Sequence, residues 1–376
     1  MAIFRKKETR FVGVDIGAGG VKLIELLFED GVYKLMTYGA TDRLAEVVDT
    51  PLTENAEEAV LHIQKLVKDA GVVGKKVVAS LPVHSVFSSV IAIPEVKTEE
   101  ERRVLVEKQA AKLIPMPLEQ MVIDYQIIDG EAEKSGKTVS VPSTGAEKNI
   151  RVLITGATRK MVKTYTEIFD KSGMDLESLE TEPFALIRSL VGTDRSSIMI
   201  LDVGAFRTNM TIAEDCVPFV NRSIKVGGAM VTRKIAEQMG VSVAEAEQIK
   251  HDLAEGQTDG VPKAVEDLFM PIVNEISYAM KMHAESEWAK QAKVEKVILT
   301  GGSAHLPGLD VFLTERLNVR TYVGDPWARI KVHESLRPVL DEIGPRYSVA
   351  LGLAMHAKKE EKQESIEENE RERTKR

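Results

Sequence analysis

This chain of 376 residues has little cysteine, no excess of positive charge and no long hydrophobic run, and each shortage excludes a class of protein. The single cysteine, Cys216, cannot form a disulfide within the chain, and no cysteine pair has the spacing of zinc ligands. The 50 basic and 58 acidic residues leave a net charge of −8, which offers no general attraction to nucleic acid. No run approaches the roughly 18 uninterrupted apolar residues of a membrane-spanning helix, and residues 1–10 are too basic and too short for a signal peptide. We therefore expect a cytoplasmic protein with no nucleic-acid partner and no transmembrane segment.

A glycine-dense loop joins two apolar runs within residues 11–25. The loop consists of Gly17, Ala18, Gly19 and Gly20. The pattern predicts a tight β-hairpin whose glycines bring backbone N–H groups close to a phosphate. Asp15, before the loop, would hold the water shell of Mg²⁺, and Lys22, after the loop, would offer a positive charge to the same phosphates. An ordinary turn is the alternative on local grounds.

A second copy of this pattern occupies residues 199–212. Three apolar residues precede Asp202, and a β-branched residue, Gly204 and an apolar-rich return strand with Thr208 follow it. Asp202 lies 187 residues after Asp15, which is half the chain, so the repeat predicts two related domains that each open with a hairpin. Two such hairpins facing each other across a cleft would grip a polyphosphate from both sides, and each would contribute one carboxylate to the metal.

Two later segments have the composition of phosphate-binding or nucleoside-binding sites. Gly227 and Gly228 open an expected helix, where N–H groups and the helix dipole would meet a phosphate. In the next expected helix, Glu247 and Lys250 lie three residues apart on one face. These two side chains either form an ordinary intrahelical ion pair or hydrogen-bond a ribose and flank an adenine.

A third glycine-containing loop follows an expected strand over residues 296–300 and consists of Gly301, Gly302 and Ser303. Because the two glycines carry no Cβ, a flat base could lie against this backbone. Glu182 lies at the start of an expected helix, shortly before the second hairpin. Its carboxylate would either cap that helix or orient a water molecule toward a γ-phosphate.

Residues 82–175 differ in character from the segments around them. A β-rich stretch ends at Pro94, and Thr98 and Glu101 then supply the capping box of a helix. Residues 129–149 are polar and rich in Gly, Ser and Lys, which predicts a loop. We expect a small α+β subdomain inserted into the first domain, which serves either as a partner-binding site or as an ordinary structural insert.

The order of the three loops resembles that of the actin-like ATPases, which include MreB and FtsA. The matching residues are Val14-Asp15-Ile16-Gly17 with Lys22, Leu201-Asp202-Val203-Gly204, and Leu299-Thr300-Gly301-Gly302-Ser303. Glu182-Pro183 looks like the interdomain helix that carries the water-activating carboxylate in MreB-like members, and Glu247 with Lys250 is similar to their nucleoside-binding helix. The resemblance implies an α/β actin-like bilobal fold, in which two RNase H-like domains enclose a cleft for ATP. It also implies that Asp15 and Asp202 hold Mg²⁺ there through water.

The inserted subdomain resembles that of the type IV pilus assembly protein PilM family, whose members are FtsA-like. The resemblance rests on residues 80–87, 93–94 and 114–125, and it spans residues 11–357. It implies an ATP-binding scaffold at the inner face of the plasma membrane that binds the N-terminal cytoplasmic peptide of the inner-membrane protein PilN. Such a scaffold would link the membrane platform to the pilus motor ATPases. Family members commonly have hydroxyl residues in the first loop, whereas residues 18–20 supply none here.

The resemblance also implies a division of the chain. We expect a first actin-like domain over 1–81, to which a C-terminal helix over 325–357 returns, and an insert over 82–175. An interdomain helix over 176–196 would lead to a second actin-like domain over 197–324 with nucleoside-binding helices within 221–268, and a charged flexible tail would occupy 358–376. Three other functions stay open, namely an active actin-like ATPase, a small-molecule kinase and an FtsA-like cell-division filament protein. Formation of a homo-oligomer and the rate of ATP hydrolysis stay open as well.

Overall fold

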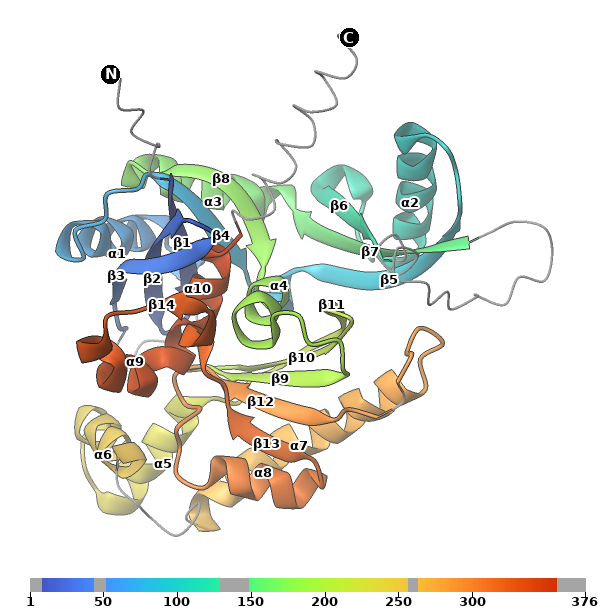
Figure 1. Cartoon of the computed structure of the whole chain (residues 1–376). Helices are drawn as coiled ribbons and strands as arrows, with labels where there is room; N and C mark the ends of the chain where they lie inside the picture. Colours follow the sequence, from blue (N-terminus) through green and yellow to red (C-terminus); the bar gives the residue numbers. More distant parts are fainter. Residues whose placement is uncertain (1–8, 44–51, 129–148, 256–262, 292, 357–376) are drawn as a thin grey trace, which may run out of the picture.

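The computed structural model describes residues 9–43, 52–128, 149–255, 263–291 and 293–356, which form two large sheets and a smaller one, joined by helices (Figure 1). The tail expected for 358–376 and most of the loop expected for 129–149 lie outside the described residues. Within this described part, no helix has the length and apolar character needed to cross a membrane.

The first sheet begins with the predicted hairpin. β1 (Thr9–Gly17) and β2 (Gly20–Glu29) pair antiparallel, with Asp15 opposite Lys22, which confirms the hairpin expected for residues 11–25. The sheet has the order β14-β3-β2-β1-β4-β8, completed by β3 (Val32–Ala40), β4 (Lys76–Leu81), β8 (Asp175–Thr181) and β14 (Ile330–Lys331). One face packs on α1 (Ala56–Asp69) and α3 (Arg159–Ser172), and the other on α9 (Arg337–Ile343) and α10 (Ser348–Ala354). We call this sheet with its helices the first lobe.

The second sheet repeats this arrangement and, with its helices, forms the second lobe. β9 (Ile198–Val203) and β10 (Thr208–Glu214) form the second predicted hairpin, and β11 (Val217–Ile224) continues the meander. β12 (Lys296–Thr300) then runs parallel to β9, just as β4 runs parallel to β1, and β13 (Arg320–Val323) lies at the far edge. One face is covered by α5 (Gly228–Met239), α7 (Lys263–Ala284) and α8 (Leu309–Leu317), with α6 (Val243–Glu255) packed on α5.

Two crossing helices join the lobes. α4 (Glu182–Leu186) continues as a π-helical turn over Ile187–Val191, and its apolar side chains share one hydrophobic core with residues of both large sheets. α10 crosses α4 so closely that a Cβ on Gly352 would lie 1.9 Å from the carbonyl oxygen of Ala185. Only a glycine permits this backbone approach, so the relative position of the two helices depends on one residue.

The insert contains the third sheet, which lies beside β11 of the second lobe (Figure 1). Its strands β5 (Phe87–Pro94), β6 (Met121–Ile127) and β7 (Asn149–Thr158) pair antiparallel in the order β5-β7-β6. α2 (Glu99–Leu113) packs on this sheet and begins at the predicted capping box, which is confirmed. There the Thr98 hydroxyl accepts a hydrogen bond from the Glu101 N–H at 3.2 Å, and the Glu101 carboxylate accepts one from the Thr98 N–H at 3.4 Å.

The segment 325–357, expected to be one helix, instead contains strand β14 and the separate helices α9 and α10. The structure also corrects two expected boundaries. Residues 175–181 pair with β4 as strand β8, so the helix expected for 176–196 begins only at Glu182. α3, expected within the insert, packs instead against α1 in the core of the first lobe. The part of the insert with its own sheet therefore ends at β7. In both cases the pairing partner lies far away in the chain, so local sequence did not reveal it.

Candidate functional site

A cavity of about 620 Å³ lies between the two lobes, where the loops of both hairpins meet. Its lining includes residues from the first hairpin, the second hairpin, α4, α6 and the third glycine loop. The residues singled out from the sequence that line it are Asp15, Gly17, Ala18, Gly19, Lys22, Glu182, Asp202, Gly204, Glu247, Lys250, Gly301, Gly302 and Ser303. The tertiary fold thus brings together three loops that are far apart in the sequence.

The two hairpin loops approach each other directly. A Cβ on Gly19 would lie 2.8 Å from the Cβ of Ala205, so the tip of the first loop touches the second loop. Asp15 is buried and accepts a hydrogen bond from the Ser80 hydroxyl at 2.7 Å, which fixes its carboxylate at the base of the first loop. Asp202 lines the same cavity from the second lobe. The two repeated aspartates therefore share one enclosed space.

Negative charge is concentrated in this cavity. Burial, and after it the charge of Asp15, raises the pKa of Asp202 to about 7, while Lys22 offsets part of the shift. Burial, and after it the charges of Asp15 and Asp202, raises the pKa of Glu182 well above its usual value. Three carboxyl groups thus lie together in one cavity, and a bound cation would relieve the repulsion between carboxylates there.

Glu182 does not cap its own helix. Its Oε2 atom accepts hydrogen bonds from the Val83 N–H at 3.1 Å and from the Asn209 amide at 3.0 Å. Val83 belongs to the segment that enters the insert, and Asn209 lies opposite Asp202 in the second hairpin. The carboxylate therefore connects the insert, the interlobe helix and the second lobe at one point of the cavity wall.

Four residues singled out from the sequence are not among those that line the cavity: Gly20, Thr208, Gly227 and Gly228. Gly20 faces the segment after β3, because a Cβ there would lie 1.9 Å from the Thr41 carbonyl oxygen. The hydroxyl of Thr208 is buried and donates to the Val226 carbonyl at 2.7 Å.

The start of α5 gives no support to the expected phosphate site, because two of its first N–H groups already have partners. The Gly228 N–H donates to the Gly204 carbonyl at 3.0 Å, and the Ala229 N–H donates to the Ala205 carbonyl at 2.8 Å. These bonds join the second loop to α5. The glycines at this position therefore allow close packing of loop on helix and leave these two donors unavailable to an anion.

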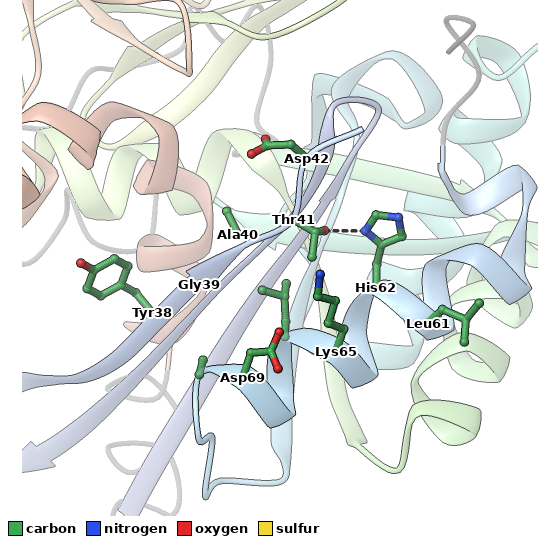
Figure 2. Close-up of a pocket in the computed structure, with 11 residues that line it drawn as sticks. Tyr38, Gly39, Ala40, Thr41, Asp42, Leu61, His62, Lys65 and Asp69 are labelled. Carbon is green, nitrogen blue, oxygen red and sulfur yellow. Dashed lines mark hydrogen bonds between the residues drawn. The ribbon is translucent and has the colours of Figure 1, made fainter. Parts of the chain in front are cut away.

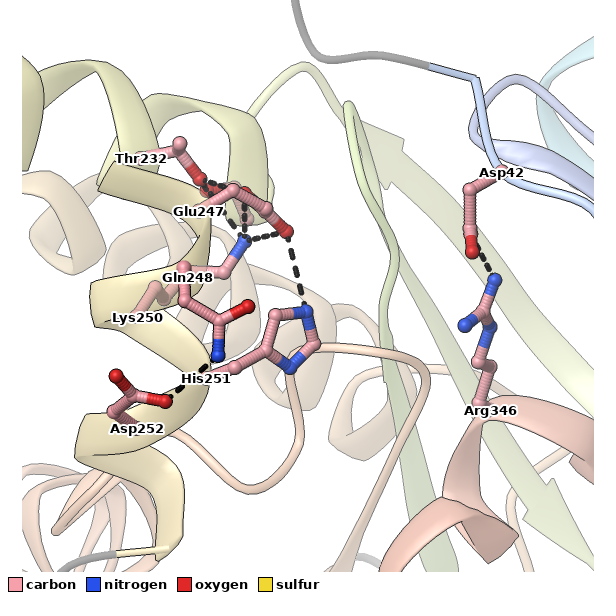
Figure 3. A network of polar contacts seen from close by, with 9 residues as sticks. Asp42, Thr232, Glu247, Gln248, Lys250, His251, Asp252 and Arg346 are labelled. Atoms are coloured by element: carbon pink, nitrogen blue, oxygen red, sulfur yellow. Dashed lines mark hydrogen bonds and ion pairs between the residues drawn. The ribbon is translucent and has the colours of Figure 1, made fainter. Parts of the chain in front are cut away.

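The side of the cavity formed by α6 contains a polar network (Figure 3). Lys250 donates to both carboxylate oxygens of Glu247 at 2.7 and 2.8 Å and to the Thr232 hydroxyl at 2.9 Å. The ordinary ion pair weighed from the sequence is thus formed, and both of its members also line the cavity. Gly302 has open space around the position of a Cβ, as a surface for a flat base requires.

Several lining residues escaped the sequence analysis. Arg43 and Asn209 line the cavity, as do Asp42 and Arg346, which form an ion pair on the side facing α6 (Figure 3). Asn209 could have been found, because the repeat aligns it opposite Asp202 in the hairpin. The other three carry no local signal, since charged residues next to strand ends are common on protein surfaces.

A second hollow of about 590 Å³ lies between the end of β3 and α1 (Figure 2). It shares Asp42 with the main cavity and has His62, Lys65 and Asp69 on its helical side. His62 forms a hydrogen bond through Nδ1 with the Thr41 hydroxyl at 2.6 Å. The charged groups of this hollow are of mixed sign, and no residue of the first loop is among those that line it.

Two matched hairpins, two crossing helices and a shared cavity define an actin-like fold with a cleft between its lobes, as the sequence predicts. The structure of MreB5 of Spiroplasma citri bound to ADP has a TM-score of 0.50, with 12% sequence identity, over 95% of this chain and 98% of that chain. A structure described as a PilM-PilN type IV pilus biogenesis complex has a TM-score of 0.75, with 23% identity, over 92% of this chain and 97% of that chain.

The sequence comparisons identify the family. A family model described as type IV pilus assembly protein PilM matches residues 13–358, so this chain belongs to that family. The cell division protein FtsA of Borreliella burgdorferi is 22% identical over 93% of this chain and 91% of its own length. FtsA of Bacillus subtilis is 22% identical over 62% of this chain, and the match spans only 57% of that protein. The type IV pilus assembly function predicted from the motifs is confirmed at the level of the family, and the cell-division alternative is weaker.

Proposed function

We propose that this chain is a scaffold of type IV pilus assembly that binds ATP with Mg²⁺ in the cleft between its lobes. One observation carries the proposal: corresponding loops of the two lobes, each with an aspartate, line the same cavity. The MreB5 structure, which has the same fold and is bound to ADP, supports a nucleotide as the ligand. The volume of about 620 Å³ lies in the range of small-molecule and cofactor sites.

The residues present fit a hydrated magnesium ion. Asp15 and Asp202 supply oxygen ligands from opposite sides, and Mg²⁺ usually keeps several waters and takes few protein ligands. Lys22 would meet the phosphates, together with the backbone of the first loop. The nucleoside would lie between the Glu247–Lys250 pair and the loop of Gly301, Gly302 and Ser303. When bound, the ion would neutralise phosphate charge beside the crowded carboxylates.

We further propose that the insert binds the N-terminal cytoplasmic peptide of a PilN-like inner-membrane protein. The PilM-PilN complex, which is similar to this chain, supports this choice of partner. The insert exposes large apolar side chains at Val104, Leu113, Met116 and Val122, which an extended peptide would cover. Such binding would place the chain at the cytoplasmic face of the plasma membrane, where it would link the platform to the motor ATPases, either singly or as a homo-oligomer.

Contacts between the insert and both sides of the cleft would couple the two ligands. The Val83 N–H of the insert's entry segment donates to Glu182 in the cavity. On the other side, the Arg151 guanidinium of β7 donates to the Trp288 carbonyl of the second lobe at 3.2 Å. Closing the lobes on a nucleotide would therefore shift the insert, and by linkage a bound peptide would change nucleotide affinity by the same factor.

The test is calorimetric titration with Mg-ATP and with a peptide from the cytoplasmic start of the partner, separately and together. We expect Asp202→Ala to retain the fold and lose Mg-ATP binding, whereas Asp267→Ala, an exposed aspartate of the same lobe, should bind normally. Reciprocal coupling of the two ligands supports the scaffold. Normal Mg-ATP affinity in Asp202→Ala would refute the assignment of the site.

Active ATP hydrolysis is the second candidate, favoured by Glu182. This carboxylate is buried in the cavity wall and oriented by two donors, as a residue that positions an attacking water would be. Steady phosphate release without any partner, abolished in Glu182→Gln, would favour an enzyme over a scaffold.

A further inference from the structure

The first loop has no side chain that can donate a hydrogen bond to a phosphate. Between Ile16 and Val21 it contains three glycines and Ala18, so any phosphate contact from the loop itself must come from backbone N–H groups. Such groups bind an anion well only if their peptide planes are held in advance in the right orientation. Glycine-rich backbone is intrinsically free to rotate, so another part of the molecule must hold it.

The segment directly after β3 provides this support. The Thr41 N–H donates to the Val21 carbonyl at 2.9 Å, and the Thr41 hydroxyl accepts from the Val21 N–H at 3.2 Å. The Arg43 N–H donates to the Gly19 carbonyl at 3.2 Å, and its guanidinium donates to the Ala18 carbonyl at 3.4 Å. Two consecutive carbonyl groups of the loop are therefore turned toward Arg43.

Arg43 is in turn held by α1. Its guanidinium is paired with both carboxylate oxygens of Glu58, at 3.0 Å from Nε and 3.4 Å from a terminal nitrogen. The side chain of Arg43 is only 7% exposed, so this pairing takes place largely out of water. His62, one turn further along α1, holds Thr41 by the hydrogen bond visible in Figure 2. The first loop is thus connected through Arg43 and Thr41 to α1, and these contacts restrict the motion of its glycine-rich backbone.

We propose that Arg43, oriented by Glu58, is a positioning residue that presents the Gly19 N–H to a nucleotide phosphate. Across a planar trans peptide, a carbonyl and the following N–H point in opposite directions. Because the Ala18 carbonyl faces Arg43, the Gly19 N–H faces the other way. A cationic donor on that carbonyl also polarises the peptide and strengthens its N–H as a donor. This inference rests on the nucleotide-binding function proposed above.

The rival role is direct contact between Arg43 and the phosphates, because Arg43 also lines the cavity. The two roles predict opposite effects of Glu58→Ala. If Arg43 positions the loop, loss of Glu58 releases the guanidinium from its place, and the loop binds phosphate less well. If Arg43 binds phosphate directly, loss of Glu58 removes a competing anion, and ATP binds more tightly.

The experiment measures the affinity of the full chain for Mg-ATP and for adenosine by calorimetry. We expect Glu58→Ala to weaken Mg-ATP binding by about five- to tenfold, as for the net loss of one ordinary hydrogen bond, with adenosine unaffected. Glu57→Ala is the matched control, since Glu57 is exposed in the same helical turn and carries the same charge. A merely structural role for Glu58 would weaken both ligands equally.

Arg43→Lys is the second variant, because it keeps the positive charge and loses the planar group that contacts Glu58 and Ala18 together. We expect the same selective loss of Mg-ATP affinity. Unchanged or tighter Mg-ATP binding in Glu58→Ala, or full affinity in Arg43→Lys, overturns the inference while the nucleotide site stands. Failure of the unaltered chain to bind Mg-ATP overturns both. Thermal melting without nucleotide shows that each variant is folded.

Discussion

Alanine at Gly301 should destabilise the second lobe, whereas alanine at the neighbouring Gly302 should leave stability intact and weaken nucleotide binding. Gly301 has a φ of +90°, and a Cβ there would lie 2.4 Å from Oδ1 of Asp202 and 2.6 Å from the carbonyl oxygen of Val203. At Gly302, no heavy atom lies within 4 Å of the corresponding position. The two glycines thus offer the same substitution in opposite environments, one residue apart.

The magnitude for Gly301→Ala follows from two terms. A side chain at positive φ costs about 1–2 kcal/mol, and forcing an extra methyl group into a packed site costs about 1–3 kcal/mol. The Val203 carbonyl cannot withdraw freely, because it accepts the Ser303 N–H at 3.1 Å. We therefore expect a loss of about 2–5 kcal/mol in the free energy of unfolding. For Gly302→Ala we expect no loss, and we expect about tenfold weaker ATP binding because the methyl group projects where the base would lie.

Scanning calorimetry without nucleotide measures the first effect, and titration with Mg-ATP measures the second. At about 2–4 °C per kcal/mol, Gly301→Ala should melt at least about 4 °C below the unaltered chain. An unchanged melting temperature for Gly301→Ala would refute the positive φ of Gly301 and its close approach to Asp202 and Val203. Wild-type ATP affinity for Gly302→Ala would show that the base lies elsewhere.

Two further predictions concern stability. Gly352→Ala should cost about 1–3 kcal/mol and lower the melting temperature, because the new Cβ would meet the Ala185 carbonyl oxygen at 1.9 Å; an unchanged melting curve would contradict the close crossing of α10 and α4. The second prediction concerns Asp194, whose pKa is lowered to about 2 by a hydrogen bond from Lys296 at 2.5 Å. The ionised Asp194 carboxylate therefore stabilises the folded chain at pH values above the pKa that Asp194 has in the unfolded chain, and this contribution is lost as the pH falls through about 2. Because the Asp194 side chain is 38% exposed, Asp194→Asn should lower the free energy of unfolding by only about 1 kcal/mol near pH 7 and by less near pH 2, as measured by urea unfolding. An equal loss at both pH values would speak against the pairing of Asp194 with Lys296.

The hairpins and the capped helix could be predicted because the contacts that specify them are local. Asp15 and Lys22 face each other across a turn, and Thr98 and Glu101 exchange hydrogen bonds within one helical turn. The duplication then predicted two lobes. The start of α5 shows where the sequence is ambiguous, because the same glycine pattern that suits a phosphate also suits close packing on another loop, and the Gly228 N–H is bonded to the second loop.

The sequence by itself determined which segments form the loops, that the two halves share a plan, and to which family the chain belongs, since these depend on residue type and spacing along the chain. Only the tertiary structure decided that β8 is a strand, that Glu182 is bound from the insert and the second lobe, and that Arg43 and Glu58 hold the first loop. Each of these features needs two segments that are far apart in the chain to meet. The packing of whole lobes decides which segments meet, because no local pattern of residues specifies a distant partner.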